Sequence, residues 1–205
     1  MFRFLSNFFS IIFNPLLAPT ALFYLSLYAF PGSAGIYDHD TKVKAMIFIF
    51  ASTFLFSFVL IYILYKLKLI SAITLDKQSD RYIPQLVLSV LYLAIAFWLS
   101  HKLGLCNGLT LGMLATGVSA GIITIINRFW KISTHASGVS GVFAIASVLF
   151  WKYPSSGFLP MYAFIAFITV AVCASRLYLK AHTPMQIVCG FLLGAVSGFL
   201  LFYYC

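Results

Sequence analysis

The stretch PMQIVCGFLLGAVSGFLLFY, residues 184–203, decides the fold class because no charged side chain interrupts it. A bilayer core about 30 Å thick is crossed by roughly 17–25 apolar residues of α-helix, so this stretch is typical of a transmembrane span. Similar apolar runs recur along the chain, near Phe13–Phe30, Ala45–Tyr65, Pro84–Ser100, Leu105–Ile126, Ala136–Trp151 and Phe158–Ser175. The sequence therefore predicts an all-α, polytopic transmembrane helix bundle with six to seven spans.

The composition excludes a soluble globular protein. Of the 205 residues, 62% are hydrophobic and only 8% are charged, whereas soluble domains carry about 25% charged residues. The spans and their short loops use up the length, so residues 1–205 are expected to form a single membrane-embedded domain. Residues 1–15 loosely resemble a signal peptide without a small-x-small cleavage site, and we interpret them as an interfacial segment before the first span. Asn14, Pro15 and Pro19 interrupt that span.

The chain is basic, with a net charge of +9 from 13 lysines and arginines against four acidic residues. These basic residues are dispersed among short loops, and no nucleic-acid motif accompanies them. We therefore expect contacts with anionic lipid and none with nucleic acid. The lipid bilayer is the expected partner, and no obligatory protein partner is evident.

Cysteines and glycines are both expected to serve packing. The cysteines form no Cys/His pattern typical of a metal site, so we expect them to act as small apolar residues; they are Cys106, Cys173, Cys189 and Cys205. Glycines spaced four apart let helices approach closely in lipid, which predicts tight packing within one bundle, with dimerisation as the alternative. These glycines are Gly104, Gly108 and Gly112, Gly117 and Gly121, and Gly190, Gly194 and Gly198.

Polar residues gather in three segments between the predicted spans, at 76–81, 128–135 and 176–186. Two spans separate the first segment from the second, and two separate the second from the third. An even number of crossings returns the chain to the same membrane face. The three segments are therefore expected to meet at one end of the bundle.

The third segment has the features of an anion site. Thr183 is a good N-cap and Pro184 suits a first helical turn, so His182 is expected just before a helix N-terminus. Backbone N–H groups and the helix dipole favour an anion there. Arg176 could supply a two-pronged donor to phosphate oxygens, and Gln186 lies one helical turn after His182.

The other two segments add groups of the same kind. Ser133, Thr134 and His135 precede a second predicted helix, close to Lys131, and the first segment contributes Lys77 and Arg81. Together the segments suit a phosphoryl group: cations neutralise it, one histidine attacks phosphorus and the other protonates the leaving oxygen.

These residues carry a family resemblance. Ser175-Arg176-x5-His182 resembles the third signature of the type-2 phosphatidic acid phosphatase superfamily, S-R-x5-H-x3-D. Ser133-Thr134-His135 is similar to its second signature, P-S-G-H, with isoleucine for proline and threonine for glycine. The first signature, K-x6-R-P, is loosely echoed by Lys77, Arg81 and Pro84. The resemblance covers about residue 75 to the C-terminus.

The resemblance implies a role for each matching residue. His182 would be the nucleophile that forms a phosphohistidine, and His135 the general acid that later activates water. No metal or other cofactor would be needed. The residues expected to grip the phosphate are Arg176, Ser133, Lys77 and Arg81, with Lys131 and Thr134 as possible additions.

The sequence departs from the family pattern at Gln186, which stands where the family has aspartate. A glutamine carbonyl can accept the imidazole N–H but brings no charge. The comparable change in the serine protease triad costs on the order of 10⁴ in rate. Asp76 or Asp80 could supply the missing charge.

The expected function is that of a metal-independent lipid phosphatase, a phosphoric monoester hydrolase with a single phosphatase-like domain. Its substrate would be a phospholipid, polyprenyl or glycolipid phosphate. The alternatives are a lipid headgroup phosphotransferase and a non-catalytic protein that binds or transports lipid phosphates. By analogy with similar bacterial enzymes, we expect a bacterial cytoplasmic (inner) membrane protein whose site faces the periplasm or the outside. The positive-inside rule does not decide the orientation: the face with the polar segments has nine basic residues against four, but without the four assigned to the site the count is five against four.

Overall fold

The computed structural model describes residues 2–75, 77–154 and 156–204. It confirms the predicted fold class, since the described residues form helices and no strand. The α-helices are α1 (Phe2–Ile12), α2 (Ala18–Tyr24), α3 (His39–Phe50), α4 (Phe56–Lys66), α5 (Tyr82–Leu103), α6 (Gly108–Ile126), α7 (Thr134–Lys152), α8 (Leu159–Tyr178) and α9 (Pro184–Tyr203). Short 3₁₀ or π segments join or extend several of them, at Pro15–Leu17, Leu25–Ala29, Pro31–Ser33, Ala51–Leu55, Ser79–Arg81 and Ser156–Phe158.

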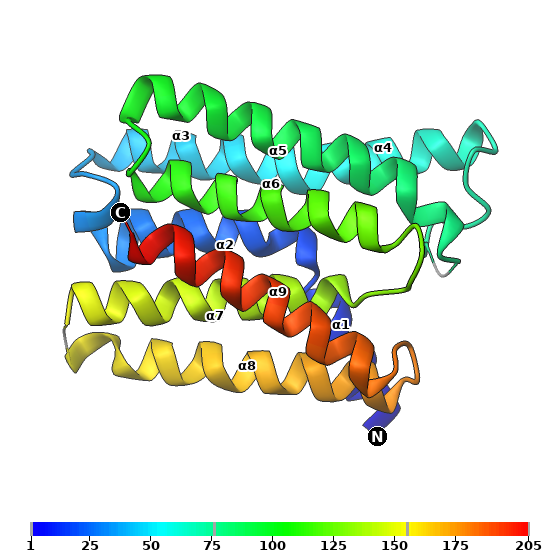
Figure 1. The fold of residues 1–205 in the computed structure, drawn as a ribbon. Helices are drawn as coiled ribbons and strands as arrows, with labels where there is room; N and C mark the ends of the chain where they lie inside the picture. The colour runs from blue at the N-terminus through cyan, green and yellow to red at the C-terminus, as the bar shows by residue number, and fades with distance from the viewer. Residues whose placement is uncertain (1, 76, 155, 205) are drawn as a thin grey trace.

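Seven helical segments in the described part of the chain are long and apolar enough to cross a membrane. Two of them are composite. The first joins α1 to α2 and spans Arg3–Ala29, and the second joins α3 to α4 and spans His39–Lys66. Figure 1 shows the long helices lying side by side.

The first span begins earlier than the sequence indicated. Helix starts at Phe2 rather than at Phe13, and it breaks where Asn14 and Pro15 were expected to interrupt it. The Asn14 side chain accepts a hydrogen bond from the backbone N–H of Leu16 at 3.0 Å, which caps the next helical turn. This break separates α1 from α2 and leaves α1 packed along α8.

The three polar segments lie at one end of the bundle, as the crossing parity predicted. In Figure 1 the loops between α4 and α5, between α6 and α7, and between α8 and α9 all occupy the right-hand end, where the N-terminus also lies. The C-terminal end of α9 lies at the opposite end.

Glycines set the closest helix contact, between α7 and α9. A Cβ atom at Gly190 or Gly194 would overlap the backbone carbonyls of Ser133 or Ser137, and one at Gly198 would lie 2.9 Å from the Gly141 carbonyl oxygen. The predicted packing within one bundle is therefore confirmed for these three positions.

Two packing predictions from the sequence were wrong. Gly104 ends α5 with a φ of +89°, and an added Cβ would meet nothing within 4 Å, so its role is conformational. Cys106, in the loop at the end opposite the polar segments, is disulfide-bonded. Cys173 and Cys189 are free and half-buried, and Cys205 lies outside the described residues.

Replacing Gly194 by valine should separate α9 from α7. Overpacking of this kind lowers the free energy of unfolding by about 1–3 kcal/mol, so the thermal midpoint of the detergent-solubilised protein should fall. Val196→Leu, which enlarges an exposed side chain on the same helix, is the control and should leave the midpoint unchanged. Equal midpoints for the two variants would contradict the packing described.

Candidate active site

The start of α9 is held by reciprocal hydrogen bonds around His182. The Thr183 hydroxyl accepts from the backbone N–H of Gln186 at 3.4 Å, and the Gln186 side-chain oxygen accepts from the Thr183 N–H at 3.0 Å. This capping box confirms the predicted helix start and fixes the Gln186 side chain beneath the histidine.

His182 has one ring nitrogen engaged. Its Nδ1 lies 3.3 Å from the same Gln186 side-chain oxygen, which can only accept a hydrogen bond. The proton therefore sits on Nδ1, and the lone pair of a neutral ring is on Nε2. That tautomer is the one a nucleophilic histidine requires.

The surroundings keep His182 uncharged. Burial, followed by the positive charges of Arg81, Arg176 and Lys131, lowers the pKa of His182 from 6.5 to about 3, although the hydrogen bond to Gln186 opposes the shift. At neutral pH the imidazole is a free base surrounded by cations. Such a site would favour an incoming anion.

His135 lies in the first turn of α7 and contacts α1. Its Nε2 lies 3.1 Å from the backbone carbonyl oxygen of Ser10, so Nε2–H donates and Nδ1 remains to exchange a proton. The Ser10 hydroxyl is itself buried and has no hydrogen-bond partner among the described residues. Sequence reasoning missed this contact; its only signal is the polar residues Ser6, Asn7 and Ser10 on a mainly apolar helix.

Two arginines flank the histidines from other helices. Arg176 comes from the last turn of α8, and Arg81 precedes α5. The Arg81 Nε donates to the backbone carbonyl oxygen of Leu75 at 2.7 Å, which fixes the guanidinium at the cavity wall. Fixed guanidinium groups are well suited to phosphate oxygens.

An amide network ties the first two polar segments together. The Asn127 side chain donates to the Gln85 side-chain oxygen at 2.8 Å and accepts from the Ile132 N–H at 3.0 Å. The Gln78 side chain donates to the Asn127 carbonyl oxygen at 2.7 Å. This network, which sequence reasoning also missed, joins α5 to the loop before α7.

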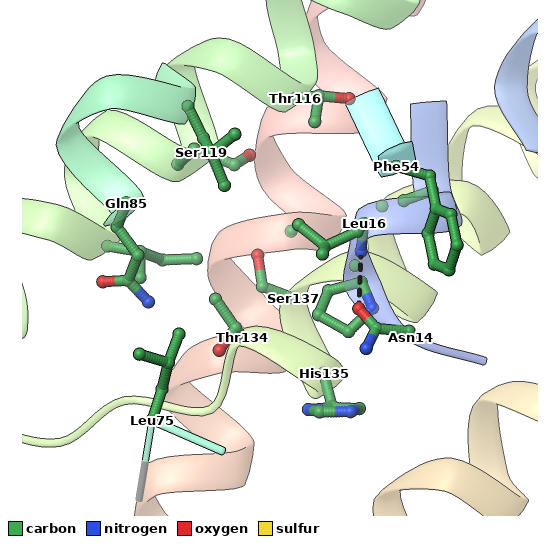
Figure 2. Close-up of a pocket in the computed structure, with 18 of the residues that line it drawn as sticks. Asn14, Leu16, Phe54, Leu75, Gln85, Thr116, Ser119, Thr134, His135 and Ser137 are labelled. Carbon is green, nitrogen blue, oxygen red and sulfur yellow. Dashed lines mark hydrogen bonds between the residues drawn. The ribbon is translucent and has the colours of Figure 1, made fainter. Parts of the chain in front are cut away.

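His182 lines two cavities. The larger, of about 610 Å³, is lined at the end of the bundle that carries the polar loops by His182, His135, Arg176, Arg81 and Thr134. The smaller, of about 440 Å³, is lined by Lys131, Lys180, Thr183 and Gln186, among others. Figure 2 shows Thr134, His135 and Ser137 on α7 around the larger cavity, with Asn14 and Gln85 on other elements.

Two of the predicted phosphate-binding residues line neither cavity. Ser133 is fully buried, and its hydroxyl accepts from the Ala136 N–H at 3.3 Å as the N-cap of α7. Its backbone N–H donates to the Gln186 carbonyl oxygen at 3.2 Å, so it links α7 to α9. Lys77 is exposed on the loop before α5.

The family comparison agrees with this arrangement. The family model of the PAP2 superfamily matches residues 18–205, which include both histidines and both arginines. The chain belongs to the PAP2 superfamily. No curated protein and no solved structure matches it significantly.

Asp80 does not replace the family aspartate in this PAP2 protein. The Asp80 carboxylate accepts hydrogen bonds from the Ser71 backbone and side chain, so it stabilises the loop between α4 and α5. Asp76 lies outside the described residues. Within the described ranges, no group of three or more His, Cys, Asp or Glu side chains is placed to hold a metal ion.

Replacing Gln186 by glutamate adds a charge without changing side-chain size. A carboxylate within about 4–6 Å stabilises the imidazolium, so the pKa of His182 should rise from about 3 toward its ordinary value. The pH dependence of the His182 ¹⁵N chemical shifts, or of its modification by diethylpyrocarbonate, measures the change. Gln186→Ala, which removes the acceptor without adding charge, should not raise the pKa, and a similar rise in both variants would disprove the contact.

Proposed function

We propose that this PAP2 protein is a metal-independent lipid phosphatase that works through a phosphohistidine on His182. The observation that supports the proposal most strongly is the hydrogen bond from His182 Nδ1 to Gln186. It leaves Nε2 unprotonated beside the two arginines, at the catalytic end of a largely apolar cavity. Gln186 thus orients the His182 imidazole as the family aspartate would, but it brings no negative charge.

In the first step, the Nε2 lone pair forms a bond to phosphorus as the bond from phosphorus to the lipid oxygen breaks. Arg176 and Arg81 neutralise the non-bridging oxygens, whose charge they are placed to meet. Protonated His135 gives a proton to the departing oxygen, so a neutral alcohol leaves.

In the second step, water attacks the phosphohistidine and the nitrogen–phosphorus bond breaks. His135, now neutral, takes the proton of the attacking water, and the Nε2 lone pair of His182 is restored. The smaller cavity gives His182 a polar side with Lys131 and Lys180. Water would reach the phosphohistidine from that side, and an alcohol in the same place would make the enzyme a phosphotransferase.

A membrane lipid is the substrate class that suits the position of the site. The histidines lie at the ends of membrane-spanning helices, the level at which a lipid carries its phosphate. The cavity extends from them into the bundle between mainly apolar side chains. This arrangement applies equally to phospholipid, polyprenyl and glycolipid phosphates.

His182→Ala should abolish phosphate release from lipid phosphates in the presence of EDTA. His135→Asn, which removes the general acid, should lower kcat about 10²–10⁴-fold. His101→Ala is the control, since His101 is exposed at the far end of α5 and should retain full activity. Lipid phosphate binding without release by the wild type would favour a non-catalytic protein, and release that depends on an added alcohol would favour the phosphotransferase.

We propose further that the catalytic end faces the cytoplasm, opposite to the orientation expected by analogy. Disulfides persist on the oxidising side of a membrane, and Cys106 is disulfide-bonded at the far end. Single cysteines at exposed Lys180 and Ile36, in an otherwise cysteine-free protein, test this orientation. In intact cells an impermeant maleimide should label position 36 and spare position 180, and the reverse pattern would establish the outward orientation.

A further inference from the structure

The larger cavity continues well beyond the catalytic groups. It is lined along α7 from Thr134 to Ile145, a distance of about 16 Å at 1.5 Å per helical residue. On α5 it reaches Tyr92, whose hydroxyl is buried without a well-formed hydrogen bond among the described residues. The cavity therefore penetrates about half of a bilayer core roughly 30 Å thick. Phosphate chemistry at the helix ends does not require this depth.

The walls of this deep part are mainly hydrocarbon. Leu88, Ala120 and Val142 line it from α5, α6 and α7. Thr116 adds a hydroxyl, but that group already donates to the Gly112 carbonyl oxygen at 2.8 Å within its own helix. Because polar groups are few along these walls, namely the hydroxyls of Tyr92, Thr116 and Ser119, the cavity favours hydrocarbon over water.

The cavity also has a side opening toward the bilayer. Five of its lining residues are exposed: the apolar Ile11 (72%), Phe58 (53%) and Ile73 (44%), and the polar Asn7 and Thr74. They come from α1, α4 and the loop after α4, so the opening lies between α1 and α4. Because the three large side chains among them are apolar, a lipid chain could pass this opening in contact with hydrocarbon.

The inner end of the cavity is closed by one hydrophobic cluster. Leu22 of α2, Ala115 of α6 and Ile145 of α7 are at most 4% exposed, line the cavity and pack in the same cluster. Since protein interiors are close-packed, the size of these three side chains fixes how far a ligand can extend.

We propose that this chamber binds one hydrocarbon chain of the lipid phosphate, and that Leu22, Ala115 and Ile145 determine the chain length that fits. The chain would enter between α1 and α4 and place its phosphate between His182 and the arginines. A cavity of about 610 Å³ is in the range that encloses one small ligand, so a second chain would stay in the bilayer. The inference rests on the proposed function, which supplies the lipid phosphate as the substrate, and adds that the protein selects this lipid by the length of one hydrocarbon chain.

Two variants with opposite effects test the chamber. Ala115→Leu fills its inner end and Ile145→Ala enlarges it, and each is assayed with lysophosphatidic acids of increasing acyl length. In the wild type, kcat/KM should rise about fourfold for each added methylene that becomes buried until the chamber is full. The optimum should move to shorter chains in Ala115→Leu and to longer chains in Ile145→Ala. Opposite shifts cannot arise from partial unfolding.

The matched control is Ala94→Leu, the same enlargement at an exposed position of α5 that does not line the cavity. It should keep the wild-type optimum and hydrolyse each substrate at the wild-type rate. An optimum that stays unchanged in both chamber variants would overturn the proposal.

Photo-crosslinking separates this proposal from the proposed function. A lysophosphatidic acid with a diazirine at the end of its chain is bound to the His182→Ala variant, which requires no turnover. Labels should fall on peptides that contain Leu22, Ala115 or Ile145. Labels confined to bilayer-facing residues such as Phe97 and Val170 would refute the chamber. Labels at the inner end, together with a wild type that releases no phosphate, would refute the phosphatase and support the chamber.

Discussion

The close contact between α7 and α9 is the constraint on which the rest of the site depends. Gly190 and Gly194 let α9 lie directly against the α7 backbone, with no side chain between them. The Ser133 N–H can therefore donate to the Gln186 carbonyl oxygen, which ties the helix that carries His135 to the helix preceded by His182. In a bilayer, where the hydrophobic effect does not drive helices together, small residues are the main means of fixing such a distance.

Given that geometry, the electrostatics of the site follow from an excess of cations. Burial and the nearby basic side chains keep the His182 imidazole neutral, which suits a nucleophile and favours a bound anion. The same excess explains how a glutamine can stand where the family has aspartate: the amide still fixes the tautomer, while the substrate phosphate would itself bring the negative charge that stabilises a developing imidazolium.

The sequence predicted the features that depend on local or periodic patterns. Apolar runs predicted the spans, and Thr183 with Pro184 predicted the start of α9. The even number of spans between the polar segments predicted that their three loops lie at the same end of the bundle. It did not predict contacts between distant segments, such as Ser10 with His135, because one backbone carbonyl leaves no mark in a sequence. A match to a sequence motif also did not predict where the side chain points. Ser133 matches a signature, yet its hydroxyl caps α7 instead of facing the cavity.

The contact of α1 with His135 bears on where the part of the chain that builds the histidine site begins. The family match starts at residue 18, whereas the carbonyl that holds His135 belongs to Ser10. A fragment cut at the family boundary would retain both histidines and both arginines, yet would lose the acceptor for His135 and one wall of the side opening. The family match and the set of residues that build the site therefore have different limits, and helix α1 belongs to the site although it lies outside the match.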